Sequence, residues 1–343
     1  MSASKNQQVL LRRRPAGPPA VDDFELVETP LPDPKDSEVL VRAIYLSLDP
    51  YMRGRMSATK SYAPPVAIGG VMEGRVVGQV VRSRHPAFKA DDIVFGGFGW
   101  QAYSAVEGKL LRTLDPRDAP ISTALGVLGM PGMTAYIGMT DIGRPKARET
   151  VVVSAASGAV GAVAGQLAKI TGARVIGIAG GKEKCRYVVD ELGFDACLDH
   201  RDDNLAAMLD RHCPGGIDVY FENVGGAVQR AVFPRLNDFA RVVFCGMVAE
   251  YNDPEPPPGP NLMALVRKRL LLKGFIVSDH YDRFAEFHAA LLPLVRDGRI
   301  KYREDIVDGL ENAPKAFIGL LQGRNFGKLI VKIGSDPTGR TAA

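Results

Sequence analysis

A segment of small residues, 156–161 (ASGAVG), begins shortly after the apolar run at residues 151–153. It fits the pattern G-x-G-x-x-G with alanine in the first place, and it opens a predicted helix after a predicted strand, which is the context that dinucleotide binding requires. Glycine at 158 lets the backbone approach a pyrophosphate, and glycine at 161 lets the helix pack closely on the strand. Free N–H groups at the start of the helix bind phosphate oxygens. The predicted dinucleotide contacts are Ser157, Gly158, Ala159, Val160 and Gly161; a turn of small residues without a ligand is the alternative.

The end of the second predicted strand distinguishes NAD from NADP. An NAD site carries Asp or Glu about 20 residues after the glycines, where the carboxylate binds the ribose 2′-hydroxyl. Gly180 and Gly181 occupy this place, and Lys182, Glu183 and Lys184 follow them. A 2′-phosphate suits the lysines, so the sequence predicts NADP. A solvated turn is the alternative interpretation of the same charges.

Two further segments follow predicted parallel strands at the edge where ligands bind in such sheets. Asn223 comes after the fourth strand, and Cys245, Gly246 and Met247 come after the fifth. Asn223 is either a cofactor contact or a helix cap, and its position favours the cofactor contact.

Metal chemistry finds no support in the sequence. None of the five histidines, which are His85, His200, His212, His280 and His288, has a Cys or His partner at a zinc-binding spacing. Cys185 falls on a predicted helix and Cys197 on a predicted strand, which is typical of structural cysteines. We therefore expect neither a structural nor a catalytic zinc ion.

Without a metal, a carbonyl group must be polarised by hydrogen-bond donors, and tyrosine hydroxyls are suitable because their high pKa keeps the proton available. Tyr51, Tyr62 and Tyr251 lie in irregular segments. Each alone is compatible with a packing or surface role. Tyr251 is the preferred catalytic candidate because it follows the fifth strand and precedes the proline-rich segment 253–260, which we expect to be stiff and extended.

Composition limits the class of protein. A length of 343 residues suggests two domains, and 46% hydrophobic with 24% charged residues excludes a disordered chain, a collagen and a coiled coil. The net charge of +4 gives no case for nucleic acid. Four cysteines without a CxxC pair indicate a reducing compartment. Residues 1–19 lack a signal peptide, and the uncharged stretches 119–140 and 151–168 are interrupted by Pro, Gly or polar residues. We expect a cytoplasmic protein with no membrane span.

The pattern of elements changes near residue 125. Short apolar or alternating runs separated by Pro and Gly clusters predict a β-barrel or sandwich over the first 120 residues. Beyond residue 150, strands alternate with helices of about ten residues, which predicts βαβ units and a doubly wound parallel sheet. The predicted strands of that sheet are 151–153, 174–179, 196–198, 217–221, 240–246 and 270–277, and the predicted helices include 159–171, 182–192, 204–212, 227–236 and 281–296.

Five motifs together carry a family resemblance: residues 45–53 (YLSLDPYMR), 130–136 (MPGMTAY), 155–161 (AASGAVG), 220–226 (YFENVGG) and 323–328 (GRNFGK). On these, the chain resembles the zinc-independent medium-chain dehydrogenase/reductases, in the group of prostaglandin reductases, alkenal double-bond reductases and curcumin reductases. The resemblance implies an α/β fold in which a Rossmann domain, residues 126–299, is inserted into a GroES-like β-barrel domain, residues 1–125 and 300–343.

The resemblance also implies NADPH as the cofactor and a homodimer. It implies a tyrosine at position 251 lining the substrate cleft, with Tyr51 and Tyr62 as further candidates for the substrate pocket. His200 stands where the family usually has a cofactor-contacting tyrosine, and Gly181 replaces a serine often seen before the lysine. Besides the glycine loop, the cofactor contacts implied are Lys184, His200, Asn223, Cys245, Gly246, Met247, Phe275, Ile276, Val277 and Asn325.

The expected activity is NADPH-dependent reduction of the carbon–carbon double bond of α,β-unsaturated aldehydes and ketones. Negative charge develops on the carbonyl oxygen, and donors such as Tyr251 and the cofactor ribose hydroxyl would stabilise it. A quinone reductase on the same scaffold is the nearest alternative. A non-catalytic NADPH-binding protein is the alternative from another class, because fold does not imply function.

Overall fold

The computed structural model describes residues 5–255 and 257–339, so one proline of the segment 253–260 lies outside the described residues. The chain forms two compact units. The first comprises Met1–Gly126, Glu304–Asn325 and Leu329–Ala343, and the second comprises Val127–Arg303 and Phe326–Lys328. Among the described residues, no helix combines the length and the apolar character needed to cross a membrane.

The second unit is built on a six-stranded parallel sheet with the strand order β10-β9-β8-β11-β12-β13. This order is the doubly wound arrangement of a dinucleotide-binding domain, and it confirms the predicted fold class. The run at residues 151–153 is completely buried in the central strand β8, as a strand covered on both faces requires. The strands are β8 (Thr150–Ser154), β9 (Arg174–Ala179), β10 (Ala196–Asp199), β11 (Ile217–Glu222), β12 (Leu236–Phe244) and β13 (Leu271–Gly274).

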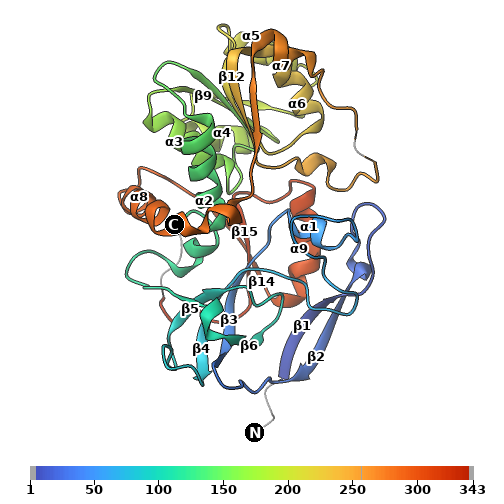
Figure 1. Ribbon diagram of the computed structural model, residues 1–343, viewed down its shortest axis with the longest axis vertical. Helices are drawn as coiled ribbons and strands as arrows, with labels where there is room; N and C mark the ends of the chain where they lie inside the picture. The colour runs from blue at the N-terminus through green and yellow to red at the C-terminus, as the bar shows by residue number, and fades with distance from the viewer. Residues whose placement is uncertain (1–4, 256, 340–343) are drawn as a thin grey trace. The chain divides into compact units, whose positions relative to one another are not determined.

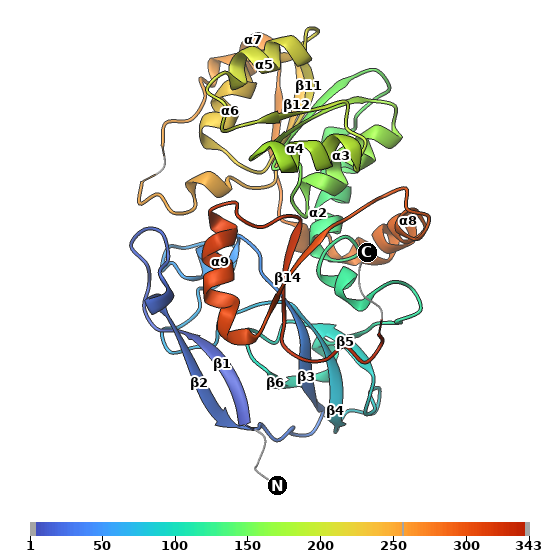
Figure 2. The same cartoon turned by 180° about the vertical axis from the view of Figure 1, so that it is seen from behind.

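Helices cover both faces of this sheet (Figures 1 and 2). Helices α3 and α4 lie on one face, and α5, α6 and α7 lie on the other, because right-handed crossovers that move in opposite directions from β8 place their helices on opposite faces. The helices are α2 (Met130–Ile137), α3 (Gly161–Ile170), α4 (Lys182–Asp190), α5 (Leu205–His212), α6 (Gly226–Val232), α7 (Met263–Lys268) and α8 (Phe284–Arg296).

The first unit contains a seven-stranded sheet with the order β14-β15-β3-β4-β5-β7, in which β6 also pairs with β3, and a two-stranded ribbon of β1 and β2. Strand β15 pairs antiparallel with β3, so the C-terminal part of the chain completes a sheet that the N-terminal part begins. Helix α9 packs Phe317 against Trp100 and Phe24 in the core. The elements are β1 (Lys5–Leu11), β2 (Phe24–Pro30), β3 (Glu38–Ser47), α1 (Met52–Arg55), β4 (Val76–Ser83), β5 (Ile93–Gly96), β6 (Tyr103–Glu107), β7 (Arg112–Thr113), β14 (Glu304–Asp308), α9 (Ala313–Leu321) and β15 (Lys328–Lys332).

Four predicted elements of the second unit have bounds that differ from the structure by three residues or more. The helix predicted at 227–236 ends at Val232, since a 3-10 turn containing Pro234 follows it, and β12 then begins four residues earlier than predicted. The strand predicted at 270–277 ends at Gly274, because its neighbour β12 ends at Phe244 and offers no further backbone partners. A 3-10 helix, Val277–Arg283, then precedes α8, so that helix starts three residues later than predicted.

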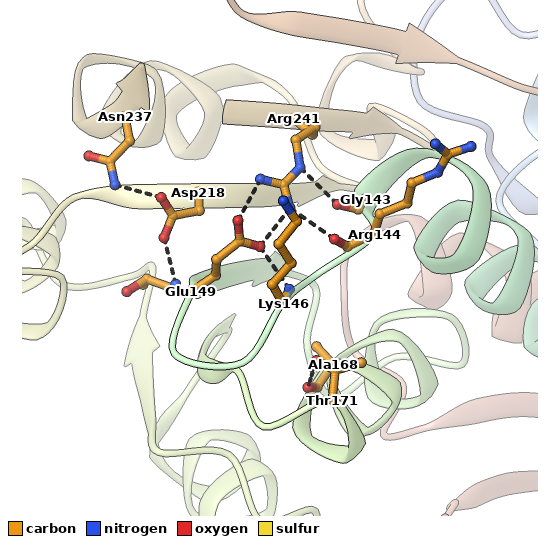
Figure 3. A network of polar contacts seen from close by, with 10 residues as sticks. Gly143, Arg144, Lys146, Glu149, Ala168, Thr171, Asp218, Asn237 and Arg241 are labelled. Atoms are coloured by element: carbon orange, nitrogen blue, oxygen red, sulfur yellow. Dashed lines mark hydrogen bonds and ion pairs between the residues drawn. The ribbon is translucent and has the colours of Figure 1, made fainter. Parts of the chain in front are cut away.

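An ion pair links Glu149, the residue before β8, to Arg241 of β12 (Figure 3). The Arg241 guanidinium donates from Nη1 to Glu149 Oε1 over 2.9 Å and from Nη2 to Oε2 over 2.6 Å. It also donates to the carbonyl oxygens of Gly143 and Arg144, while the Lys146 backbone N–H donates to Glu149. This network lies at the end of the sheet opposite the glycine loop.

Candidate functional site

The glycine loop joins β8 to α3 through a tight turn. The Gly158 N–H donates to the Ala155 carbonyl over 2.9 Å, and the Ala162 N–H donates to the Gly158 carbonyl over 3.0 Å. A Cβ built on Gly161 would lie against the Ala155 carbonyl oxygen and 2.9 Å from its carbon. Any side chain at position 161 would therefore open the turn, and the start of α3 remains accessible to a phosphate group only with glycine there.

Alanine fits the first position of the fingerprint because a glycine of the neighbouring strand makes room for it. Ala156 is fully buried, and a Cβ built on Gly177 of β9 would lie only 2.8 Å from the Ala156 Cβ. Gly177 of β9 thus allows the loop to approach the neighbouring strand closely even though position 156 is alanine. The residues present fit a dinucleotide pyrophosphate at the start of α3.

The turn between β9 and α4 is shaped by a carboxylate from β10. Asp199 Oδ1 accepts the N–H groups of Gly181, over 2.9 Å, and Arg201, over 3.0 Å. Desolvation opposes ionisation of Asp199, but these backbone donors and the nearby cationic groups outweigh it and lower its pKa. Gly181 adopts φ = +95°, a conformation that suits glycine, so a residue with a Cβ would be strained at this position.

Sequence reasoning missed Arg201, which lies over the same turn. A Cβ built on Gly180 would lie 2.8 Å from His200 Nε2 and 3.3 Å from Arg201 Nε, and one on Gly181 would lie 3.3 Å from Arg201 Nη1. Burial is the main cause that lowers the pKa of His200. Together with Lys184 in the first turn of α4, the guanidinium gives this turn a second cation. A basic residue just past the third strand was the available sequence signal.

A buried polar network fixes Asn223 at the carboxyl end of β11. Its side-chain amide donates to the Ser154 carbonyl over 2.7 Å, and its backbone N–H donates to Ser154 Oγ over 2.8 Å. Helix α6 has no side-chain cap, so Asn223 does not act as one. The Ser154 hydroxyl in turn donates to Glu222 Oε1, which also accepts the N–H groups of Val224 and Gly225. Ser154 and the fully buried Glu222 were not identified from the sequence, although a carboxylate inside an apolar strand is an unusual feature.

The segment after β12 lies at the same edge of the sheet. The N–H groups of Cys245 and Gly246 both donate to the Glu222 carbonyl. Burial, with a smaller contribution from Glu222, raises the pKa of the Cys245 thiol to about 12, so this thiol is not a nucleophile. Tyr251 follows a 3-10 turn, Val248–Glu250, and a Cβ built on Gly246 would lie 2.7 Å from the Tyr251 hydroxyl oxygen. Met247 is partly exposed beside this turn.

The remaining predicted residues lie in two places. Phe275, Ile276 and Val277 directly follow β13, so they extend from the carboxyl edge of the sheet in the second unit. Asn325 ends a segment of the first unit. The next residue, Phe326, belongs to the second unit and packs edge-on against Tyr187 of α4, with ring centroids 5.0 Å apart.

The first unit brings Tyr51 and Tyr62 together around a buried arginine. The Arg55 guanidinium carbon lies 5.6 Å from the centre of the Tyr51 ring and 4.4 Å from that of Tyr62. Arg55 Nε donates to Glu73 Oε1 over 2.6 Å. The sequence did not indicate this cation, which is only 5% exposed. Cation–π contacts of this kind position the tyrosine rings.

Within 5–255 and 257–339, no three or more His, Cys, Asp or Glu side chains gather in a way that could hold a metal ion.

The fold and the glycine loop define a two-unit oxidoreductase with a dinucleotide-binding domain. A family model described as the N-terminal domain of oxidoreductase matches residues 7–114, and one described as zinc-binding dehydrogenase matches residues 159–295. The chain belongs to the medium-chain dehydrogenase/reductase family, in its zinc-independent group of double-bond reductases.

Relatives cover almost the whole chain. It is 51% identical over 338 residues to the NADPH-dependent curcumin reductase of Escherichia coli. This alignment covers 97% of this chain and 98% of the relative. It is 41% identical to a 2-alkenal reductase (NADP(+)-dependent) of Nicotiana tabacum, over 96% of this chain and 98% of the relative. The crystal structure of CurA in complex with NADPH from Vibrio vulnificus matches with a TM-score of 0.93 and 48% identity, over 96% of this chain and 100% of that one. An Escherichia coli quinone oxidoreductase, at 20% identity, shares the fold.

Proposed function

We propose that this protein is an NADPH-dependent reductase of the carbon–carbon double bond of α,β-unsaturated aldehydes and ketones. The observation that carries the proposal is the 51% identity to a curcumin reductase along 97% of the chain. Alkenal and prostaglandin reductases among the other relatives act in the same chemical class, judged by their names.

The second unit binds the cofactor through the carboxyl edge of its sheet. The loop from Ser157 to Gly161, with Ala159 and Val160 between the glycines, holds the pyrophosphate at the start of α3. Lys184, His200 and Arg201 surround the turn that receives the 2′-phosphate, and the geometry around Gly180 and Gly181 supports this assignment. The other proposed cofactor contacts of this unit are Asn223, Cys245, Gly246, Met247, Phe275, Ile276 and Val277.

When bound, NADPH supplies the hydride that reduces the β-carbon of the substrate. The chain's own task is to orient the enone and to stabilise the negative charge that develops on its carbonyl oxygen as the enolate forms. Tyr251 donates its hydroxyl proton in a hydrogen bond to that oxygen. The α-carbon then takes a proton from water or from a hydroxyl group.

The two units divide the work. The barrel domain, residues 1–125 and 300–343, provides the substrate pocket with Tyr51 and Tyr62, whose rings are held by Arg55. The domain formed by residues 126–299 holds the dinucleotide. The compact units of the structure have boundaries near these positions, which supports the proposed division.

The protein is a homodimer in this proposal. Strand β13 forms an edge of the parallel sheet, and the adjoining apolar side chains of Leu262, Met263, Val266 and Leu271 are each at least half exposed. An unprotected strand edge beside an apolar patch favours pairing with a second copy. Size-exclusion chromatography with light scattering tests this: a dimeric wild type and a monomeric Val266→Glu variant support it, whereas a monomeric wild type overturns it.

The protein acts in the cytoplasm. Its four cysteines are all present as free thiols, which suits a reducing compartment. Fractionation of the source cells tests this assignment, and recovery of the protein outside the cytosolic fraction would contradict it.

A turnover panel separates the proposed activity from its rivals. NADPH oxidation is measured with enals, enones and quinones in parallel. Turnover of enals and enones supports the proposal. Turnover of quinones alone would favour a quinone reductase, for which the structural relative at 20% identity shows a shared fold only. Tight NADPH binding without turnover of any compound would favour a non-catalytic binding protein.

A further inference from the structure

Two of the four cysteines, Cys185 of α4 and Cys197 of β10, lie on elements that pack against each other. Cys197 of β10 pairs with Gly177 of β9, and a Cβ built on Gly177 would lie 3.2 Å from Cys197 Sγ and 2.9 Å from Val188 Cγ1. Val188 is a residue of α4, so the Cys197 thiol lies on the face of the sheet that α4 covers. Cys185 precedes Val188 by three positions and therefore shares its side of the helix.

The proximity of the two thiols changes the pKa of each. Cys185 accepts a hydrogen bond from the Cys197 thiol, and this contact is the main cause that lowers the pKa of Cys185. The same contact, followed by burial, raises the pKa of Cys197. Cys185 is thus the group that ionises first, with the proton of Cys197 directed at it. The thiolate is the reactive form of cysteine.

The other two cysteines differ from this pair. Burial raises the pKa of Cys213 to about 11 and that of Cys245 to about 12, which keeps both as unreactive thiols. Cys185, Cys197 and Cys245 are partly buried and Cys213 is buried, and among these four thiols the pKa is lowered at Cys185. Oxidants that attack thiolates should therefore distinguish the facing pair from the remaining cysteines.

We propose that Cys185 and Cys197 form a dithiol site that a peroxide converts into an intramolecular disulfide. The Cys185 thiolate attacks one peroxide oxygen, the O–O bond breaks, and the leaving hydroxide takes up a proton to become water. The resulting sulfenic acid is then attacked by Cys197 sulfur, which loses its proton, and a second water leaves as the S–S bond forms. Both cysteines are oxidised, and one hydrogen peroxide is reduced to two waters.

The disulfide changes the turn assigned to the 2′-phosphate. A disulfide requires sulfur atoms about 2.05 Å apart, which is closer than hydrogen-bonded thiols, so α4 must move toward β10. Lys184 immediately precedes Cys185, and Asp199, which accepts the Gly181 N–H, lies two residues after Cys197. Oxidation should therefore raise the KM for NADPH about fivefold or more, within the usual range of coupling between two sites. This effect rests on the proposed cofactor site, but formation of the disulfide does not.

Peptide mapping tests the modification directly. Purified full-length protein is treated with hydrogen peroxide, alkylated without reduction and digested with trypsin, which cleaves after Lys184, Arg186 and Arg201. The expected product joins the dipeptide 185–186 to the peptide 187–201, and dithiothreitol separates them. The count of free thiols should fall from four to two in the wild type and from three to one in a Cys213→Ser control. It should not fall by two in Cys185→Ser or Cys197→Ser.

Different results overturn different parts of the inference. Persistence of all four thiols, sulfonic acid at Cys185 without the cross-link, or cross-links between two chains would refute the dithiol site. An unchanged KM for NADPH in the fully cross-linked protein would refute its coupling to the cofactor turn. Because mapping needs no catalytic activity, a failure of the proposed function would leave the first result intact. Circular dichroism of the serine variants, matching the wild type, establishes that they are folded.

Discussion

The Tyr251 hydroxyl lies over the α-carbon of Gly246, so that a Cβ at position 246 would come within 2.7 Å of the hydroxyl oxygen. Both residues follow β12 at the edge of the sheet where ligands bind. If the hydroxyl stabilises the enolate, Tyr251→Phe should lower kcat and kcat/KM together by about 10- to 100-fold, somewhat less than the loss of one oxyanion donor in other enzymes. Steady-state kinetics with an enone at saturating NADPH measures this effect. A Phe variant with normal activity, and an Ala variant impaired mainly in KM, would assign Tyr251 to packing and leave Tyr51 or Tyr62 as the better candidate.

Gly246→Ala provides a second test of this relationship. Gly246 has no positive φ, so alanine is compatible with its backbone, but the new methyl group must displace the hydroxyl. The substitution should lower kcat about tenfold in the wild type, as displacement of an oxyanion donor would. In a Tyr251→Phe background the same substitution should lower kcat much less, because no hydroxyl remains to be displaced. Equal losses in both backgrounds would show that Gly246 acts independently of Tyr251.

Cofactor choice depends on cations at the turn after β9. A charge-assisted hydrogen bond contributes roughly 1.5–3 kcal/mol, which corresponds to about ten- to a hundredfold in affinity. Lys184→Ala and Arg201→Ala should each reduce the preference for NADPH over NADH by about this factor while sparing kcat/KM with NADH. Lys182→Ala, at the start of the same helix, serves as the comparison. Equal catalytic efficiency of the wild type with NADPH and NADH would refute the assignment.

In the glycine loop, an alanine substitution should be more damaging at Gly161 than at Gly158. A Cβ at Gly161 meets backbone atoms of Ala155 that cannot move without opening the turn, whereas a Cβ at Gly158 lies 3.1 Å from the Ala155 carbonyl oxygen. Gly161→Ala should therefore weaken NADPH binding by at least about tenfold and lower the thermal midpoint. Gly158→Ala should lower the thermal midpoint less than Gly161→Ala does. Fluorescence titration with NADPH and thermal melts measure both, and equal tolerance at 161 would contradict the proposed geometry.

The Arg241–Glu149 pair should stabilise the second unit in a pH-dependent way. Desolvation opposes ionisation of Glu149, but Arg241 outweighs it and lowers the carboxyl pKa below its ordinary value of 4.5. The stabilisation is therefore present above that value and is lost as the pH falls through the lowered folded-state pKa. Glu149→Gln should reduce the free energy of unfolding at pH 7 by about 1–3 kcal/mol. Denaturant melts at several pH values test this, and a deficit that persists unchanged at pH 3 would argue against ionic stabilisation.

Most of the fold follows from periodicity along the chain. The buried run in β8 and the alternating helices predicted the doubly wound sheet, because a strand buried on both faces is visible as a continuous apolar run in its own sequence. The bounds of α6, β12 and β13 did not follow, because they depend on long-range features. Phe239, at φ = +62°, interrupts β12 where its pairing with β11 shifts register, and β13 ends where its partner ends.

The sequence predicted those candidate site residues that lie next to one another in the chain. The glycine pattern at 158 and 161 is local, and the structure places these residues between β8 and the first residue of α3; their contact with phosphate stays a prediction. Arg201 and Glu222 were missed because their significance comes from contacts with other strands: Arg201 lies over a turn formed by β9 and α4, and Glu222 is bound by Ser154 from β8. Sequence spacing contains no direct information about such contacts.

The central claim is that the carbon–carbon double bond, and not the carbonyl group, is reduced by NADPH. NADPH deuterated at nicotinamide C4 on either face, turned over with an α,β-unsaturated ketone, tests this most directly when the product is analysed by NMR and mass spectrometry. We expect a saturated ketone that carries one deuterium at the β-carbon and keeps its carbonyl group, from one of the two labelled cofactors. Deuterium at the carbonyl carbon of an allylic alcohol, or no transfer from either cofactor, would contradict it.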